Sequence, residues 1–411
     1  MEHLDQDRPT TPPHQPTAGV RILRKEIEII AGLGFPDHDM ISVTQAPFGK
    51  SYNNRIYYLQ LRQTTVEKQA VQKFVLKVNG RFFGPSKIQN EVSCLRLVQK
   101  YCPSVPAPRA LAWSEDGHVA TFATPFRTES CSIDIPTGLD TLSHGRWILM
   151  TRQPGSPLAE ADLDDVTIMS IANQLGDIVA CWRQSVPTQN CCGNIRLPAP
   201  NDDETDNKLM IRGALHIGID AINPVTHIND YYKAKLEKSL ARLQTTNSFA
   251  RSRYLIEPIQ GFIRDTLPQL DLGSGRDMDP NEFVFTHYDL SPRNILISGH
   301  PPRVTGIVDF EFSGFFPAVE EFLNDAISNK RDFPRVFYNT YLEHLRMSGV
   351  ATPAAEFDSN LWNRNYWLEN LALRIAPWDL PGDYRGEELE SQLEKAEWDI
   401  RDMLEHLYNA L

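Results

Sequence analysis

The feature that most constrains this 411-residue chain is a pair of short apolar segments between residues 283 and 311. Residues 295–298 have the composition of a strand, residues 299–302 that of a turn, and residues 303–308 that of a returning strand. An antiparallel hairpin brings the residue before its first strand beside the residue after its second. The sequence therefore predicts that Asn294 and Asp309 meet at the open end of the hairpin, with Asp289 in the loop that enters it.

These side chains have a chemistry in common. Asn294 and Asp309 offer hard oxygen ligands of the kind that Mg²⁺ uses, since this ion takes few protein ligands and completes its octahedron with phosphate and water. Asp289 could orient a hydroxyl group and accept its proton. Asp and Asn also favour ordinary turns, so a single one would mean little. Together with His287, their order and spacing favour phosphoryl transfer from a metal-bound nucleotide.

The same residues carry a family resemblance. Residues 287–294 (His-Tyr-Asp-Leu-Ser-Pro-Arg-Asn) resemble the H-x-D-x-x-x-x-N catalytic loop of the protein-kinase-like fold, and residues 308–311 (Val-Asp-Phe-Glu) resemble its metal-binding segment. The residues of these two segments are similar to those of the aminoglycoside phosphotransferase and choline/ethanolamine kinase superfamily, and in particular to those of the fungal-type phosphotransferase-domain proteins. The resemblance spans about residues 40–345, and its specific part is residues 283–314.

The resemblance implies an α+β, two-lobed protein-kinase-like fold with a small antiparallel-sheet N-lobe and a mainly helical C-lobe. It implies ATP and Mg²⁺ as cofactors, Asp289 as the catalytic residue, and Asn294 and Asp309 as metal ligands. The implied reaction moves the ATP γ-phosphoryl group to a hydroxyl of a small metabolite. A choline/ethanolamine-type kinase, a catalytically silent binding protein and a protein kinase are the alternatives. Against a protein kinase, residues 46–54 lack a G-x-G-x-x-G loop and no A-P-E sequence follows Asp309.

The chain divides into segments that fit this fold. Residues 1–18 are polar and Pro-rich and are expected to be a disordered tail. Residues 19–152 are expected to form the nucleotide-covering N-lobe, and residues 153–411 the C-lobe with the catalytic loop and the acceptor site. Residues 125–144 are turn-rich and suggest an insertion. The strands expected in the N-lobe are 41–47, 55–61, 70–78, 110–113, 119–124 and 146–151, with a helix over 85–101. The helices expected in the C-lobe are 166–184, 229–244, 250–268, 318–328, 333–348, 359–375 and 387–410.

Lys77 and Glu91 are the expected nucleotide-site pair of the N-lobe. An apolar strand with one lysine directs that ammonium to a single face, and a buried ammonium needs an anion. Glu91, on the following helix, is placed to supply it, as in the Lys–Glu pair of the kinase-like fold. A surface position for Lys77, with Lys73 in its place, is the alternative.

Two further segments are expected to contact the nucleotide. The loop over residues 46–54 would cover the phosphates through backbone N–H groups and the Ser51 hydroxyl, although its only glycine is Gly49. A plain hairpin loop is the alternative there. Residues 150–155 are similar to the hinge between lobes, so Met150, Thr151 and Gln153 are expected to border the adenine.

Composition excludes several classes of partner. The net charge of −12 argues against nucleic acid, whose binding needs Lys and Arg to release counterions, and against an anionic membrane surface. It favours a cationic acceptor by electrostatic steering. No apolar run approaches a membrane span and the N-terminus has no signal-peptide core. The six cysteines show no paired CxxC spacing. These features predict reduced thiols and a cytoplasmic location.

The acceptor site is less defined. Trp362, Tyr366, Trp367 and Trp378 could box an amine by cation–π contact, but aromatic residues at helical spacing are more often core. Glu320, Glu321 and Asp325 could pair with an amino substrate, and a solvated helix face is the favoured interpretation. His287 is expected to brace the catalytic loop. Glu311 could assist the metal or tie down its own loop.

Overall fold

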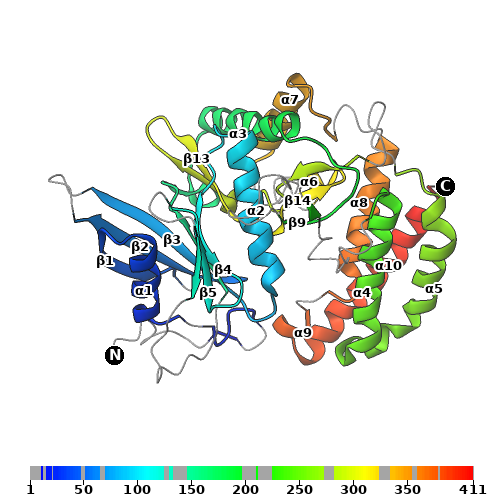
Figure 1. Ribbon diagram of the computed structural model, residues 1–411. Coiled ribbons are helices and arrows are strands. Elements are labelled where there is room, and N and C mark those ends of the chain that lie inside the picture. Colours follow the sequence, from blue (N-terminus) through cyan, green and yellow to red (C-terminus); the bar gives the residue numbers. More distant parts are fainter. Residues whose placement is uncertain are drawn as a thin grey trace.

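The protein consists of a sheet-containing lobe at the N-terminal end and a helical lobe at the C-terminal end (Figure 1). The computed structural model describes residues 11–12, 15–20, 22–47, 51–64, 70–124, 129–132, 146–196, 210–211, 225–272, 282–323, 334–353, 359–377 and 380–410. The last strand of the large sheet leads directly into the helical lobe, so one short segment links the two.

A seven-stranded antiparallel sheet forms the body of the N-lobe, in the order β1-β2-β3-β7-β4-β5-β6. Its strands are β1 (His38–Gln45), β2 (Asn54–Gln63), β3 (Val71–Asn79), β4 (Ala110–Ser114), β5 (Val119–Phe122), β6 (Ser130–Ser132) and β7 (Trp147–Thr151). Alternation along β3 sorts its side chains between two faces. Leu76 and Val78 join the hydrophobic core on the side of α1 (Arg24–Gly34), whereas Lys77 faces the opposite way.

The second face of the sheet is covered by α2 (Pro85–Tyr101), which has Pro at its first turn. Ile88 and Val92 of α2 pack against Trp113, Ile148 and Met150 in a small buried cluster. This packing places Glu91, on the same helix, beside the face of β3 that carries Lys77. The predicted strands and this helix are therefore present.

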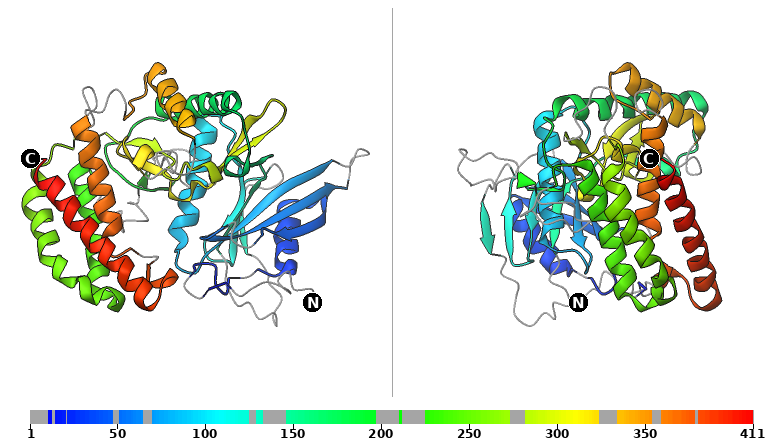
Figure 2. Two further views of the ribbon diagram at one scale, coloured as in Figure 1. Left: turned by 180° about the vertical axis from the view of Figure 1, so that it is seen from behind. Right: turned by 90° about the vertical axis from the view of Figure 1, so that its right-hand side faces the viewer.

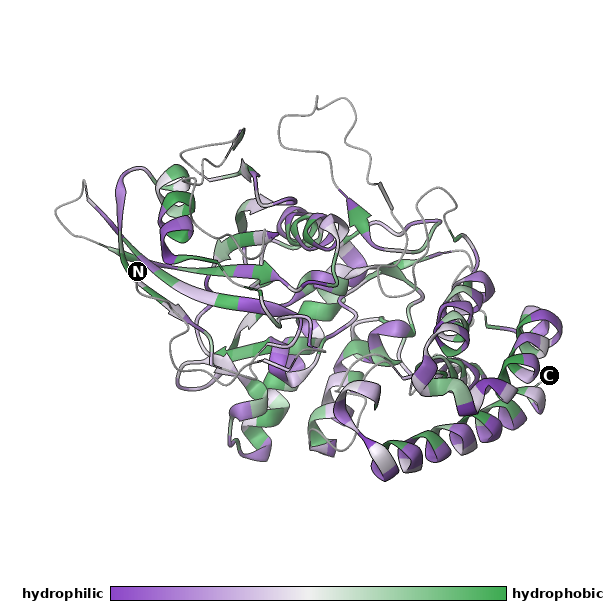
Figure 3. Cartoon of the chain, turned by 90° about the horizontal axis from the view of Figure 1, so that it is seen from below, coloured by the Kyte–Doolittle hydropathy of each residue, from purple (hydrophilic) through white to green (hydrophobic). Residues whose placement is uncertain are grey.

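The C-lobe is built mainly from helices (Figure 2). Those with α-helical geometry are α3 (Asp165–Ser185), α4 (Ile228–Thr245), α5 (Ile256–Gly261), α6 (Glu320–Leu323), α7 (Arg335–Met347), α8 (Ser359–Arg374), α9 (Leu380–Asp383) and α10 (Gly386–Tyr408). Helix α3 packs on α7, and α8 packs on both α4 and α10. Along α10 the hydrophilic and hydrophobic residues alternate in the manner of an amphipathic helix (Figure 3).

Short strands hold the loops between the lobes. β12 (Ile295–Ser298) and β13 (Arg303–Ile307) form the predicted hairpin, and β8 (Ser156–Pro157) adds to the free side of β12. β11 (Val284–Thr286) pairs with β14 (Gly314–Phe316), and β9 (Ile195–Arg196) with β10 (Met210–Ile211). These pairings fix the catalytic segment at both of its ends.

Three expectations from the sequence need correction or lie outside the described residues. The helix expected over 250–268 is a succession of 3-10, α and π turns, in a segment that contains Pro258, Gly261 and Pro268. The expected disordered tail differs at its inner end, where Thr17 and Ala18 are buried. Most of the expected insertion at 125–144 lies outside the described residues, as do residues 1–10.

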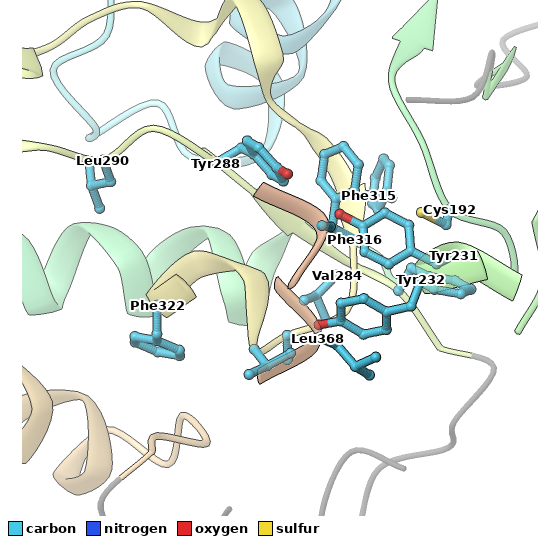
Figure 4. Close-up of a cluster of buried hydrophobic side chains, with 14 of the residues drawn as sticks. Cys192, Tyr231, Tyr232, Val284, Tyr288, Leu290, Phe315, Phe316, Phe322 and Leu368 are labelled. Carbon is cyan, nitrogen blue, oxygen red and sulfur yellow. The ribbon is translucent and has the colours of Figure 1, made fainter. Parts of the chain in front are cut away.

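Buried aromatic residues form the centre of the C-lobe. Tyr231 and Tyr232 of α4 pack with Phe315 and Phe316 of β14 and with Tyr288 of the catalytic segment (Figure 4). The ring centroids of Tyr288 and Phe316 are 4.9 Å apart. The catalytic segment therefore rests directly on the hydrophobic core.

Candidate active site

The predicted hairpin places Asn294 and Asp309 at its open end. Ile295 pairs with Ile307, and one step further the Val308 N–H donates to the Asn294 carbonyl at 3.0 Å. Asp309 then adopts a left-handed backbone, with φ 72° and ψ 54°, which turns the chain into a 3-10 helix over Phe310–Phe312. Aspartate is among the few residues that tolerate this conformation.

Lys77 lies at the centre of a buried charged cluster. Its Nζ is 2.8 Å from Glu91 Oε2, 2.5 Å from Asp309 Oδ1 and 2.8 Å from Glu311 Oε2. Burial alone would lower the pKa of Lys77, but the carboxylates of Asp309, Glu311 and Glu91 together raise it well above its usual value. Lys77 is thus a fixed cation that bridges the N-lobe to the metal-binding segment of the C-lobe.

Glu311 is a second junction between the lobes. Its carboxylate accepts hydrogen bonds from Asn53 Nδ2 at 2.8 Å and Asn54 Nδ2 at 2.7 Å, at the start of β2. Lys87 Nζ, also completely buried, lies 2.9 Å from Glu311 Oε2. Although burial favours the protonated form, Lys77 and Lys87 hold the pKa of Glu311 well below its usual range. Of the two roles expected for Glu311, these contacts support the one in which it ties down a loop.

The catalytic loop is braced by its histidine. His287 Nε2 donates to the Val308 carbonyl at 3.1 Å, and Nδ1 accepts from the Asp289 N–H at 3.3 Å. Burial lowers the pKa of His287 to about 3, so the ring is neutral at physiological pH and keeps this tautomer. The bracing position expected from the sequence is therefore what the structure contains.

Asp289 lies in the loop that enters the open end of the hairpin, and it is held by Asn294 and Arg293. Asn294 Nδ2 donates to its backbone carbonyl at 2.8 Å and to its Oδ2 at 3.1 Å. Arg293 Nη2 lies 2.6 Å from Oδ1 and 2.8 Å from Oδ2. Burial, reinforced by Asp309 and opposed by Arg293, raises the pKa of Asp289 to about 6. A carboxylate with this pKa is suited to general-base work near neutral pH.

The oxygen donors fit a divalent metal ion. The Asn294 amide nitrogen is engaged by Asp289, so the amide oxygen is the atom of that side chain left to ligate. The carboxylates of Glu91, Asp309 and Glu311 lie within 4.8 Å of one another. Burial, opposed by Lys77, raises the pKa of Glu91 to about 7, and a cation bound beside these acids would favour their ionised forms. Hard oxygen ligands in this arrangement suit Mg²⁺.

A cavity of about 320 Å³ lies between the lobes and joins these groups. Its walls include every nucleotide-site and metal-site residue expected from the sequence: Ser51, Lys77, Glu91, Met150, Thr151, Gln153, Asn294 and Asp309. Asp289 is not part of that lining, but it is hydrogen-bonded to Asn294 and Arg293, which are. A larger cavity of about 640 Å³ lies beside α4 in the C-lobe and contains none of these residues.

The hinge segment borders this cavity with some of its backbone already engaged. The Thr151 N–H donates to the Arg109 carbonyl at 3.0 Å, and the Arg152 N–H to the Lys73 carbonyl at 3.1 Å. Adenine recognition through those two N–H groups, one form of the expected hinge contact, is therefore not available in this conformation. Gly155, with φ +110°, then turns the chain where a Cβ would meet the Ile297 carbonyl oxygen at 2.4 Å.

Several residues that the sequence suggested for acceptor binding have other positions in the structure. Glu320 and Glu321 are completely buried, so the solvated helix face expected for them is wrong. Glu321 accepts from the His287 N–H at 3.2 Å and pairs with Arg183. Trp362 and Trp367 pack against the C-lobe core. Asp325, Trp378 and Gly49 lie outside the described residues.

Several site residues were missed from the sequence. Arg293 had one usable signal, because it lies four residues after Asp289 and both belong to one tight loop. Lys87 and Asn54 had none, since their partner Glu311 is more than two hundred positions away in the chain; the Asn54–Glu311 bond spans 257 residues.

All cysteines are free thiols, including Cys191 and Cys192.

Comparison with protein-family models identifies the family of this chain. The model described as the phosphotransferase enzyme family matches residues 44–357, which is most of the chain and includes both the Lys77 strand and the catalytic hairpin. The chain belongs to the phosphotransferase enzyme family. The expected α+β architecture, with an antiparallel-sheet N-lobe and a mainly helical C-lobe, is confirmed, and the protein is a small-molecule kinase of this family.

Solved structures give distant similarities. A spectinomycin phosphotransferase, APH(9)-Ia, in complex with ADP and spectinomycin is 13% identical, with 95% of this chain and 99% of that chain covered and a TM-score of 0.43. An amicoumacin kinase, hAmiN, in complex with AMP-PNP, Ca²⁺ and its ligand is 12% identical (93% and 94% covered, TM-score 0.48). An ethanolamine kinase from Plasmodium vivax is 12% identical (90% and 84% covered, TM-score 0.45). No curated protein matches the chain.

Within the described residues, no helix combines the length and the apolar character that crossing a bilayer would need.

Proposed function

We propose that the protein transfers the γ-phosphoryl group of ATP to a hydroxyl of a small metabolite, with Mg²⁺ as the metal. Asp289 acts as the base that orients the hydroxyl and takes its proton. Asn294 and Asp309 hold the metal. Lys77, fixed by Glu91, contacts the phosphates, and residues 150–153 border the adenine.

The observation that carries this proposal is the convergence of four groups from both lobes on one opening. Lys77 comes from β3, Glu91 from α2, and Asn294 and Asp309 from the two ends of the hairpin, yet all of them line the same cavity. These groups supply a cation for phosphate and oxygen ligands for a metal. Asp289, hydrogen-bonded to Asn294, adds the carboxylate base that phosphoryl transfer also needs. The intact set also argues against a catalytically silent binding protein.

The charges of these residues support the roles proposed for them. Mg²⁺ bound by Asn294 and Asp309 would neutralise charge on the transferring phosphates. Lys77 already contacts Asp309, so its ammonium lies beside the position where those phosphates would bind. Burial raises the pKa of Asp289 to about 6, so its carboxyl group is largely unprotonated at neutral pH, as a base must be.

Arg293 has a role in this proposal that the sequence did not suggest. It caps both oxygens of Asp289 in this structure, and its own side chain is 63% exposed. An acceptor hydroxyl that binds Asp289 would displace Arg293 from one of these oxygens or share the oxygen with it. Because Arg293 is exposed, solvent can compensate its charge when it moves, so the cost of opening is small.

The acceptor belongs, in this proposal, to the hydroxylated small molecules, with a cationic member favoured. The support is the net charge of −12, which attracts cations toward the protein by steering. The walls of the described cavity do not by themselves select one compound.

The proposal is tested by an ATP-consumption screen over alcohols, amino alcohols and aminoglycosides, with the product mass examined for a phosphoryl gain. Wild-type protein should consume ATP with at least one acceptor, and Asp289→Ala should do so about 10²–10⁴-fold more slowly. Phosphorylation of peptides in place of every small alcohol would replace the proposal with a protein kinase. Failure of the wild type to bind Mg-ATP would reject it.

A further inference from the structure

A second buried cluster, outside the nucleotide site, lies directly under the catalytic loop. Lys235 of α4 is buried between the carboxylates of Glu320 and Glu369. Its Nζ is 3.4 Å from both oxygens of Glu320, and it also donates to Glu369 Oε2. Neither the sequence motifs nor the proposed chemistry accounts for an ammonium at this depth, which is costly to bury unless it is paired.

Aromatic rings complete the surroundings of this ammonium. Lys235 Nζ lies 5.0 Å, 5.9 Å and 5.7 Å from the ring centroids of Tyr231, Tyr232 and Tyr288 respectively. These distances are within the range of cation–π attraction. In Figure 4 Tyr231 and Tyr288 turn their hydroxyl ends toward one another. We call Lys235, Glu320, Glu369 and the three tyrosines the cation cage.

Tyr288 links the cage to the catalytic loop. Lys235 Nζ donates to the Tyr288 hydroxyl at 3.1 Å, and Tyr288 immediately precedes Asp289. The backbone of Tyr288 has φ 73°, the left-handed region that bulky residues rarely adopt because Cβ crowds the carbonyl. Such strain persists only where the surroundings enforce it, and it gathers at functional sites.

The residues on either side of Tyr288 are held by other hydrogen bonds, so Tyr288 is the residue of the loop that the cation cage contacts. The His287 N–H is held by Glu321 at 3.2 Å, and the His287 carbonyl accepts from the Ser313 hydroxyl at 2.8 Å. Asp289 is held by its N–H and carbonyl through His287 and Asn294. Between these held peptides, the conformation of Tyr288 sets the backbone from which the Asp289 carboxylate projects toward Arg293 and Asn294.

We propose that Lys235 is a positioning residue for catalysis, which holds the strained Tyr288 backbone through its hydroxyl and thereby aims the Asp289 carboxylate. Lys235 touches neither substrate nor the reacting atoms. The inference rests on the proposed role of Asp289 as the base. It assigns the buried cage to the geometry of the reaction in addition to the stability of the core.

The test is a double-mutant cycle between Lys235→Met and Tyr288→Gly. Glycine adopts a positive φ without steric cost, so the backbone of the Tyr288→Gly variant no longer needs the cage. With Tyr288 present, Lys235→Met should lower kcat on the order of 10–100-fold, the size expected when a catalytic group is misplaced, while KM for ATP stays near its wild-type value. In the Tyr288→Gly background the same substitution should change kcat far less. Equal losses in both backgrounds would overturn the proposal.

The control is Lys233→Met, on the same helix but exposed, which should leave kcat unchanged. If Lys235→Met does not fold, Tyr288→Phe removes only the hydroxyl and should lower kcat with ATP affinity retained; an unchanged kcat for Tyr288→Phe would overturn the proposal.

Hydrogen–deuterium exchange separates this inference from the proposed function. Lys235→Met should accelerate exchange in peptides covering residues 284–296, and Lys233→Met should not, whether or not an acceptor has been found. Unchanged exchange in Lys235→Met would refute the positioning role. Faster exchange in a protein whose wild type never turns over ATP would instead refute the function and leave the cage–loop coupling standing.

Discussion

Glu311 offers the sharpest test of how the lobes are joined, through the substitution Glu311→Gln. The shape of the side chain is kept, but one carboxylate oxygen becomes an NH₂ donor. The native carboxylate receives only donors, from Lys77, Lys87, Asn53 and Asn54. The amide would therefore place a donor against donors, and it would remove the charge that Lys87 faces.

The magnitude follows from burial. Glu311 is 1% exposed, so solvent screening does not reduce the effect. Removing one partner of a buried ion pair costs about 3–5 kcal/mol. Lys87 would lose the carboxylate that the described residues place against it. Lys77, however, keeps Glu91 and Asp309, so we expect a destabilisation at the lower end of this range, about 3 kcal/mol. For a chain of 411 residues, whose unfolding entropy is about 2.1 cal/mol/K per residue, that corresponds to a fall in Tm of about 3–4 °C.

The assay is thermal unfolding of wild type and variant in EDTA and again with Mg-ATP, with the exposed Glu388→Gln as control. If Glu311 ties down the loop, its loss lowers Tm already in EDTA. If it were mainly a metal ligand, the difference would arise only with Mg-ATP. A Tm within about 1 °C of wild type in EDTA would refute the reasoning, since it would correspond to less than about 1 kcal/mol.

Three further predictions concern the catalytic groups. Asp289→Ala should lower kcat by about 10²–10⁴-fold, the usual contribution of a positioned base, with Mg-ATP affinity retained; calorimetry and single-turnover kinetics measure both. Because Asp289 must be unprotonated to act, kcat/KM should fall as pH drops below about 6, and Arg293→Gln should move that limb to higher pH because the cation that lowers this pKa is lost. A limb that shifts to lower pH would contradict the assignment. Lys77→Met should weaken phosphate contacts and lower kcat on the order of 10²-fold, and unchanged steady-state kinetics would exclude Lys77 from the site.

Local patterns in the sequence predicted the parts of the site that depend on neighbours in the chain. The α2 helix over Pro85–Tyr101 carried a proline at its start and an apolar face, and the hairpin after Asn294 carried strand, turn and strand in order. Hairpin closure predicted that Asn294 and Asp309 meet, and strand alternation predicted the single face to which Lys77 points, because both are local rules. The contact of Lys77 with Asp309 was not predicted, since it joins residues 232 positions apart.

Features set by distant packing could not be predicted. Glu320 and Glu321 have the sequence character of a solvated face, yet their partners Lys235 and Arg183 lie 85 and 138 positions away. Burial of a charged group is stable only with such a partner, and one sequence does not show which residues will meet. The strained φ of Tyr288 is of the same kind, since it depends on the cage beneath it.

The central claim is that the opening between the lobes binds a metal–nucleotide complex through Asp309. Calorimetric titration of ATP, with Mg²⁺ and with EDTA, into wild type and Asp309→Asn tests it most directly, because asparagine tolerates the left-handed backbone at this position while losing the charge. The account predicts that Mg²⁺ tightens ATP binding in the wild type and that the variant loses this difference. Equal metal dependence in both proteins would contradict it.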